Sequence, residues 1–211
     1  MIDLACSLGL LALVLAATGA YAIRKSLAGS ARNARVEKAG SSIFLNKGTM
    51  EMAYWALTPI ARACVRIGLT ANGVTFLALL LGAGAGVALG FGRFGLAAVL
   101  TAASSFGDAL DGIVARETHT SSDAGEVFDA AADRYEEFFF LTGLAYYFRA
   151  APLSLGLVLL GVLGSFMVSY GTAKAEALQV ESPRGSMRRA ERALYLGVGV
   201  LLAPISLAIT A

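Results

Sequence analysis

The hydrophobic residues of this chain fall into long runs that are separated by short polar stretches. The first run, Leu4–Ile23, contains no charged residue and is followed directly by Arg24 and Lys25. About twenty apolar residues are enough for a helix to cross a bilayer. A cleaved signal peptide would carry its charges before the apolar run. The pattern therefore predicts a retained transmembrane helix.

Five further apolar segments follow the first. They are Asn72–Phe91, Phe94–Arg116, Gly125–Phe148, Pro152–Leu178 and a segment from about Glu191 to the C-terminus. Together the six segments predict an all-α integral membrane protein, a bundle of six transmembrane helices. The connecting loops are short and no internal repeat is found. We therefore expect an extra N-terminal helix with a basic loop over residues 1–45, and one membrane domain over residues 46–211.

Residues 46–68 have an amphipathic pattern instead. Apolar residues at helical spacing form one stripe, which contains Met50, Tyr54, Leu57, Ala61 and Cys64. Such a pattern is typical of a surface helix or of a helix that lies in the membrane interface. We favour the interfacial helix, with Trp55 as its anchor, because a spanning segment follows at once.

Composition and charge agree with a membrane protein and indicate its orientation. The chain is 57% hydrophobic and 15% charged, with a mean hydropathy of +0.68, which excludes an ordinary soluble domain. Of the 17 lysines and arginines, eight lie between Arg24 and Arg66. Because basic loops stay in the cytoplasm, this region is predicted to be cytoplasmic and the N-terminus to lie outside. We expect a multi-pass protein of the cell (inner) membrane that contacts membrane lipids and does not bind nucleic acid.

Four aspartates stand out against this apolar background. Asp108 and Asp111 are three residues apart, and Asp129 and Asp133 are four apart, so each pair lies on one face of a helix. Only 14 residues, from Phe94 to Gly107, precede the first aspartate in its segment, which is about 21 Å of helix. The hydrocarbon core is about 30 Å thick, so this aspartate is predicted to lie within the cytoplasmic leaflet.

Carboxylates at this depth need a positive partner. A charged side chain within a bilayer costs about 2.5–3.5 kcal/mol, and less near the interface. One interpretation is a buried salt-bridge network with Arg116 and Arg134. The interpretation we favour is a polar cavity, open to the cytoplasm, that holds divalent metal. Paired aspartates on facing helices resemble a two-metal site, which promotes displacement at phosphorus.

The complete run from Asp108 to Asp133 resembles the signature of the CDP-alcohol phosphatidyltransferases. It reads Asp-x2-Asp-Gly-x2-Ala-Arg-x8-Gly-x3-Asp-x3-Asp and matches that signature in every position and gap. The segment from Thr70 to Thr75 resembles the family's Thr-Pro-Asn/Asp-x-Val-Thr, with Ala71 in place of the proline. The resemblance extends over most of Thr70–Arg192 and separates the chain from UbiA-type prenyltransferases, whose aspartate motifs are spaced differently.

This resemblance implies a membrane enzyme that moves a phosphatidyl group from CDP-diacylglycerol to an alcohol and releases CMP during phospholipid biosynthesis. It implies that Asp108, Asp111 and Asp129 are ligands of Mg²⁺ or Mn²⁺, with two ions expected, and that Asp133 is both a ligand and the general base. The residues implied to contact the CDP-lipid are Asn72, Gly73, Val74, Thr75, Gly112, Ala115, Arg116, Ser122 and Gly125. A homodimer is expected, with the active site facing the cytoplasm.

The acceptor is indicated by residues outside the signature. Asp133-Arg134, the segment Ser169–Glu176 and the region around Arg192 resemble the phosphatidylinositol-phosphate synthase type, although Thr172, Lys174 and Arg188 depart from its pattern. Basic side chains suit an acceptor phosphate, and the predicted set is Lys174, Arg188, Arg189 and Arg192. A basic loop that sets topology and touches anionic lipid is the alternative for these residues. The best prediction is an inositol phosphate or related polyol phosphate.

Three other functions fit the sequence less well. A phosphatidylglycerophosphate-type synthase is the alternative within the family, and that type tends to have Asp-Lys where this chain has Asp133-Arg134. A non-catalytic membrane scaffold would not need all eight signature positions. A transporter would need a polar path to both sides, yet the outer halves of these helices carry no charged residues. Finally, we expect Leu4–Ile23 to lie against the helix that begins near Glu191.

Overall fold

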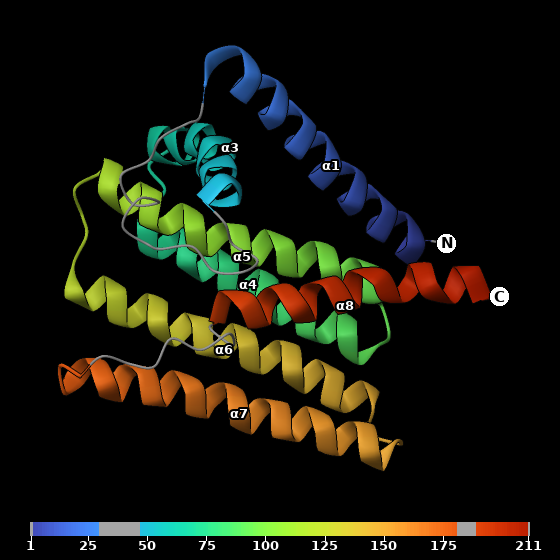
Figure 1. The fold of residues 1–211 in the computed structure, drawn as a ribbon. Helices are drawn as coiled ribbons and strands as arrows, with labels where there is room; N and C mark the ends of the chain where they lie inside the picture. The colour runs from blue at the N-terminus through green and yellow to red at the C-terminus, as the bar shows by residue number, and fades with distance from the viewer. Residues whose placement is uncertain (1, 30–46, 181–188, 211) are drawn as a thin grey trace.

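The computed structural model describes residues 2–29, 47–180 and 189–210, and within these ranges the chain forms α-helices and no strand. The helices are α1 (Ile2–Ala28), α3 (Lys47–Arg66), α4 (Ala71–Gly90), α5 (Phe94–Glu117), α6 (Asp123–Tyr147), α7 (Pro152–Ala177) and α8 (Arg189–Thr210) (Figure 1). Each apolar segment of the sequence forms one helix whose bounds differ from the predicted ones by a few residues. The prediction of an all-α fold is confirmed.

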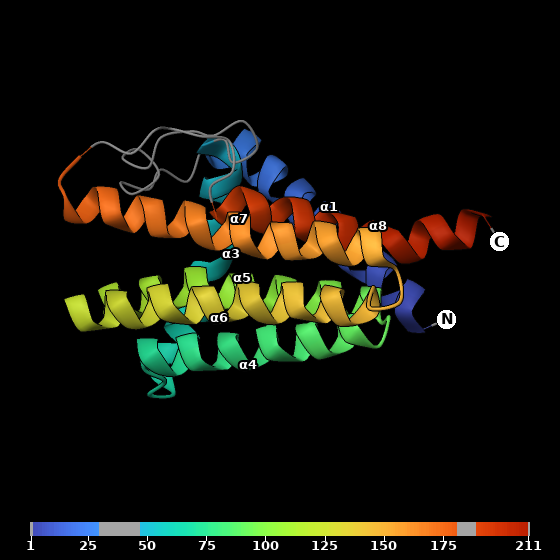
Figure 2. The ribbon, with the colours of Figure 1, turned by 90° about the horizontal axis from the view of Figure 1, so that it is seen from below.

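The central helix of the fold is α4, which packs closely against both α5 and α6. The contact with α6 is close because neither helix carries a side chain at the crossing point. A Cβ atom added to Gly86 would overlap the backbone of Phe139, and one added to Gly143 would overlap the backbone of Gly86. Figure 2 shows α4, α5 and α6 running side by side, with α7 and α8 on the opposite face of α6 and α5 from α4. The positions of α5 and α6 are therefore both set by α4.

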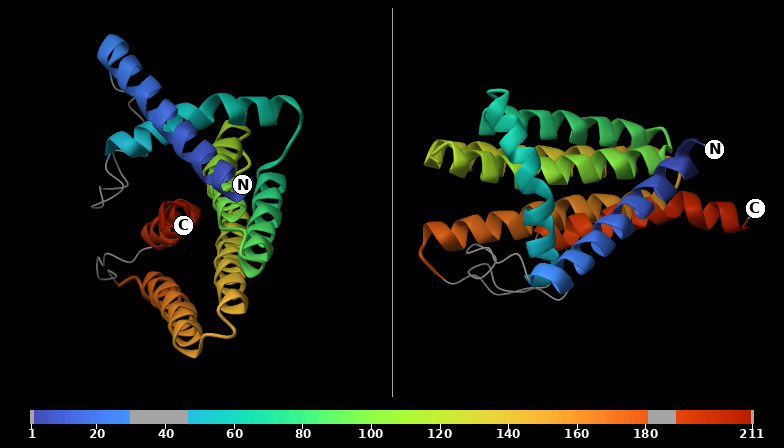
Figure 3. Two further views of the ribbon diagram at one scale, coloured as in Figure 1. Left: turned by 90° about the vertical axis from the view of Figure 1, so that its right-hand side faces the viewer. Right: turned by 90° about the horizontal axis from the view of Figure 1, so that it is seen from above.

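The amphipathic segment forms α3, which lies crosswise to α4 and α5 (Figure 3). Four of the five residues of its predicted apolar stripe, all except Met50, pack against the bundle. Leu57 and Ala61 are buried against Val74, Leu110 and Val114, and Tyr54 and Cys64 pack at the edge of the same cluster. The apolar side of α3 thus covers the start of α4 and the last turns of α5, the helix that carries Asp108 and Asp111.

The first helix, α1, crosses the bundle obliquely and is held at both ends (Figure 1). Near its start, the Asp3 carboxylate accepts a hydrogen bond of 3.1 Å from the backbone N–H of Leu96, in the first turn of α5. Near its end, the Tyr21 hydroxyl donates to Glu51 of α3 over 3.1 Å, and its ring packs on Trp55. α1 also packs against α8. The predicted contact between Leu4–Ile23 and the helix that begins near Glu191 is therefore present.

By length and composition, α1, α4, α5 and α7 are apolar enough to cross a membrane, among the residues described. These four helices agree with the prediction of a membrane protein. α6 is as long as its neighbours but carries all its charged residues between Asp123 and Glu137, including Asp129, Asp133 and Glu136. Several of these charged residues belong to the polar site that α6 helps to form.

Candidate active site

The four motif aspartates are held on α5 and α6 around a shared polar region. Asp108 and Asp111 lie on α5, and Asp129 and Asp133 lie on α6. Each pair occupies one helix face because of its spacing. α4 contacts both helices and so fixes how the two pairs are placed relative to each other. All four side chains are at least half-buried in the fold.

An open polar pocket of about 440 Å³ lies where α4, α5 and α6 meet. Its lining includes Asn72, Thr75, Asp111, Gly112, Ala115, Arg116, Ser122, Gly125 and Asp129. This set contains most of the residues predicted to contact the CDP-lipid. The other two, Gly73 and Val74, are placed differently: Gly73 lies against Leu69 and the Thr70 hydroxyl, and Val74 is buried in the cluster beneath α3.

Two helix N-termini open onto this pocket. The Thr70 hydroxyl accepts a hydrogen bond of 3.1 Å from the N–H of Gly73 at the start of α4, and Ser122 accepts one of 3.1 Å from Gly125 at the start of α6. Such hydroxyl caps fix where each helix begins. The first turn of a helix carries partial positive charge and free N–H groups, which favour an anion. With the exposed Arg116 nearby, the pocket suits a group with several negative oxygens.

Asp111 is held in a fixed orientation by Thr75. The Thr75 hydroxyl donates to Oδ2 of Asp111 over 2.6 Å, and both residues are buried. The backbone oxygen of Ala71, 3.1 Å from the same hydroxyl, is a second and more distant acceptor for its one hydrogen. The sequence predicts Thr75 as a contact of the CDP-lipid, and the structure also makes it the residue that orients a motif carboxylate.

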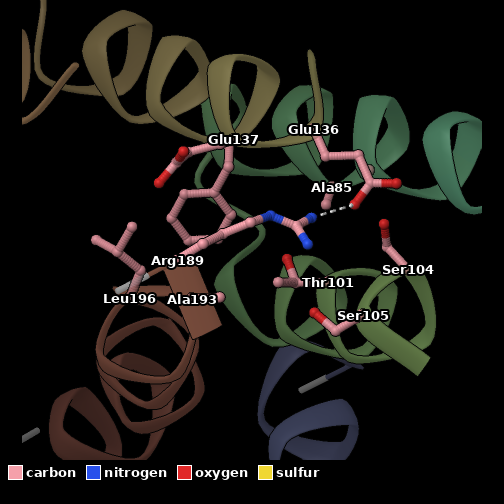
Figure 4. A pocket seen from close by; sticks show the side chains of 11 residues that line it. Ala85, Thr101, Ser104, Ser105, Glu136, Glu137, Arg189, Ala193 and Leu196 are labelled. Atoms are coloured by element: carbon pink, nitrogen blue, oxygen red, sulfur yellow. Dashed lines mark ion pairs between the residues drawn. The ribbon is translucent and has the colours of Figure 1, made fainter. Parts of the chain in front are cut away.

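Asp108 and Asp133 are both paired with Arg189, the first residue of α8. The Nη2 atom of Arg189 lies 2.8 Å from Oδ2 of Asp108 and 2.5 Å from Oδ1 of Asp133. It also lies 3.7 Å from Oε2 of Glu136 (Figure 4). One guanidinium therefore contacts three carboxylates from two helices. The four aspartates are divided, with one pair lining the open pocket and the other covered by an arginine.

The basic residues predicted for the acceptor are only partly brought together. Arg192, one turn after Arg189, pairs with Glu137 over 2.9 Å and donates to the Ser169 hydroxyl over 3.3 Å. Arg134 also contacts Ser169. Lys174 is exposed near the end of α7. Arg188 lies outside the described residues.

Glu136 and Glu137 are site residues that the sequence motif does not include. Glu136 is buried to 8% exposure and lines a cavity of about 50 Å³ together with Thr101, Ser104 and Arg189 (Figure 4). The signal is present in the sequence, because both glutamates lie one turn beyond Asp133 at the edge of an otherwise apolar run. Their partners, which come from α5, α7 and α8, have no comparable signal.

The side chains present fit a divalent metal. Asp108 Oδ1 is buried and has no hydrogen-bond partner within the described part of the chain. Aspartate oxygens are the ligands that Mg²⁺ and Mn²⁺ prefer. Within the described residues, no group of three acidic, histidine or cysteine side chains already has the arrangement of a metal site. The four aspartates are therefore suitable metal ligands, although two of them, Asp108 and Asp133, are paired with Arg189.

Comparison with known proteins gives consistent matches. The family model described as CDP-alcohol phosphatidyltransferase matches residues 68–210. A phosphatidylinositol phosphate synthase of Mycobacterium tuberculosis is 34% identical over 150 residues, which cover 68% of this chain and 69% of the relative. An archaetidylinositol phosphate synthase of Methanothermobacter thermautotrophicus is 34% identical over 138 residues, covering 64% and 68% of the two chains.

Solved structures resemble the fold as well. The crystal structure of the M. tuberculosis phosphatidylinositol phosphate synthase with CDP-DAG bound has a TM-score of 0.65 and 29% identity, covering 70% of this chain and 76% of that one. The same enzyme in complex with manganese and citrate also gives a TM-score of 0.65 and 29% identity, covering 70% and 72%. The match over most of the chain, together with the intact aspartate motif, shows that the chain belongs to the CDP-alcohol phosphatidyltransferase family of membrane transferases.

Proposed function

We propose that the protein transfers a phosphatidyl group from CDP-diacylglycerol to an inositol phosphate or a related polyol phosphate and releases CMP. The observation that carries this proposal is the pocket at the start of α4 and α6, which collects most of the predicted CDP-lipid residues. Both of the synthases named above are inositol-phosphate enzymes. The same assignment follows from Asp133-Arg134 at the end of the motif.

The donor's diphosphate would bind in this pocket. The N-termini of α4 and α6 and the guanidinium of Arg116 offer positive charge to the diphosphate oxygens. Gly112 and Gly125 line the pocket without a side chain, so the ligand can approach the backbone there. Thr75 holds Asp111 in place beneath it.

In the proposed reaction, Asp133 takes the proton from the acceptor hydroxyl. The acceptor oxygen then forms a bond to the lipid-side phosphorus, and the bond from this phosphorus to the bridging oxygen breaks, leaving its electron pair on CMP. Asp108, Asp111, Asp129 and Asp133 would hold Mg²⁺ or Mn²⁺, two ions in this proposal. The metal ions supply positive charge that favours departure of CMP. Arg189 and Arg192, with Lys174 and Arg188, would bind the acceptor's phosphate.

We propose the following arrangement in the membrane. α6 and α8 also span the bilayer, α3 lies in the interface, and the aspartates face the cytoplasm of a multi-pass inner-membrane protein. The basic residues between Arg24 and Arg66 support this orientation. A homodimer is the proposed assembly; Gly156, Gly164 and Gly171 of α7 have open space in place of a side chain, which would let a second copy approach closely.

The test of the base is Asp133→Asn, assayed by CMP release from CDP-diacylglycerol in detergent micelles with Mn²⁺. We expect a loss of at least about 10²-fold in a protein that still folds, because general base catalysis usually contributes about 10²–10⁴-fold and Asp133 is also a proposed metal ligand. Glu176→Gln, the same chemical change at an exposed position of α7, is the matched control and should retain activity. Undiminished turnover in the Asp133 variant would refute the mechanism.

The acceptor is tested separately, by mass spectrometry of lipid products. Wild-type protein, CDP-diacylglycerol and Mg²⁺ or Mn²⁺ are incubated with inositol phosphate, free inositol or glycerol phosphate. We expect the phosphatidylinositol phosphate product. A phosphatidylglycerophosphate product would overturn the acceptor assignment, and the absence of CMP release with every acceptor would favour a non-catalytic scaffold.

A further inference from the structure

Arg189 is the residue of the site around which several carboxylates gather. Its single Nη2 atom lies within 4 Å of three of them, those of Asp108, Asp133 and Glu136. The arginine comes from α8, whereas its partners come from α5 and α6. A guanidinium in this position offsets the repulsion between carboxylates that the fold forces together.

The arginine and a divalent metal need the same oxygens. Arg189 contacts one oxygen each of Asp108 and Asp133, which are two of the four carboxylates assigned to metal. The other two, Asp111 and Asp129, line the open pocket. The four aspartates are therefore divided between two environments, one shared with Arg189 and one open to the pocket.

We propose that Arg189 is a built-in counter-ion that competes with divalent metal for Asp108 and Asp133 and withdraws from both when metal binds. The proposal rests on the function proposed above, in which these aspartates hold metal. It assigns Arg189 a role toward the metal that is separate from its proposed contact with the acceptor phosphate.

Glu136 is the carboxylate partner that the Arg189 side chain can keep after it leaves the two aspartates. It lies one turn beyond Asp133 on the same face of α6, is nearly fully buried, and is not part of the aspartate motif. Its Oε1 atom has no hydrogen-bond partner among the described residues, and it lines the same small cavity as Arg189 (Figure 4). The guanidinium can therefore leave the two aspartates by side-chain rotation and keep one carboxylate partner.

The start of α8 is held by a second pair while Arg189 moves. Arg192 forms two hydrogen bonds with Glu137, of 2.9 and 3.1 Å. A bidentate pair of this kind fixes the backbone one turn after Arg189. Metal binding then frees a guanidinium that stays beside the site, so that an acceptor phosphate binds better after metal than before it, and the coupling is reciprocal.

The test compares Mn²⁺ affinity in detergent-solubilised full-length protein without substrates, measured by electron paramagnetic resonance of free Mn²⁺. In Arg189→Gln the competitor is removed, and we expect Mn²⁺ to bind about tenfold more tightly, within the usual range of coupling between sites. Arg192→Gln is the matched control, because it removes the same charge from the same helix but its carboxylate partner is Glu137. Its Mn²⁺ affinity should equal that of the wild type.

Three other results would overturn the proposal. Equal affinity in the wild type and both variants would show that Arg189 does not compete, while leaving the metal site intact. Equally tighter binding in both variants would show a general charge effect. If neither the wild type nor either variant binds Mn²⁺, the metal site assumed in the proposed function is refuted as well. This outcome differs from the first, in which all three proteins bind Mn²⁺ equally.

A measurement on the wild type covers the case in which Arg189→Gln does not fold. Phenylglyoxal modification of arginines is followed by peptide mass spectrometry with and without Mn²⁺. We expect Mn²⁺ to raise the modification rate of Arg189 by about threefold or more, because two of its three carboxylate partners are lost, and to leave Arg192 unchanged. An unchanged rate at Arg189 under saturating Mn²⁺ would overturn the proposal.

Discussion

Replacing Thr75 by valine should weaken the binding of divalent metal without altering the shape of the site. Valine has nearly the same size and branching as threonine but cannot donate the 2.6 Å hydrogen bond to Asp111. Asp111 is 5% exposed, so only the small part of its surface that faces the pocket can gain a water molecule in place of the lost donor. Hydrogen bonds to charged groups contribute about 1.5–3 kcal/mol. Loss of a group that orients a metal ligand usually costs about 10–100-fold in affinity or activity, and we expect Thr75→Val to raise the Mn²⁺ dissociation constant by this factor.

The assay is a Mn²⁺ titration of the purified protein, followed by CMP release at saturating Mn²⁺. Thr75→Ser keeps the hydroxyl and should bind Mn²⁺ nearly as well as the wild type. Thr172→Val is a second control, because within the described residues the Thr172 hydroxyl donates to the backbone oxygen of Val168 in its own helix, α7. The reasoning is refuted if Thr75→Val binds Mn²⁺ with the affinity of the wild type, or if Thr75→Ser is equally impaired.

Two further predictions concern the packing that positions the site. Gly86→Ala places a methyl group against the backbone of Phe139 and should lower the free energy of unfolding by about 1–3 kcal/mol. In the control Gly84→Ala, the added methyl group lies 3.5 Å from a methyl group of Leu100, an ordinary contact, and stability should be nearly unchanged. Thermal unfolding in detergent measures both variants, and equal melting temperatures would contradict the packing argument. Asp3→Ala removes the carboxylate that caps the first turn of α5 and should lower stability by about 0.5–2 kcal/mol in the same assay, while Asp3→Asn, which keeps an acceptor oxygen, should lose less.

The sequence determined the helices and one half of the site. Long apolar runs have few alternatives to helix in a membrane, because every backbone polar group must be satisfied internally. The predicted segments therefore match α1 and α3 to α8 within a few residues. The spacing within the run Asp108–Asp133 likewise determines by itself that two carboxylates lie on each of two helix faces, because helical periodicity is a local property.

The stripe along α3 shows the same local determination. Five residues, Met50 among them, are predicted to share one face, and the other four, Tyr54, Leu57, Ala61 and Cys64, do pack together against the bundle. The stripe does not reveal its partner. Trp55, expected to anchor the helix in the interface, packs on Tyr21 and lies near the Arg24 guanidinium of α1.

Only the tertiary structure decided which charges neutralise the aspartates. Arg189 is 56 residues beyond Asp133 in the chain and reaches it because α8 returns to the bundle beside α5. The sequence also allows a salt-bridge network with Arg116 and Arg134; in the structure Arg116 lines the open pocket, and Arg134 is paired with Glu137. Helix periodicity fixes which residues share a face, over one or two turns. Which faces meet depends on how closely the helices can pack. Here Gly86 of α4 and Gly143 of α6 allow the two backbones to touch at that contact.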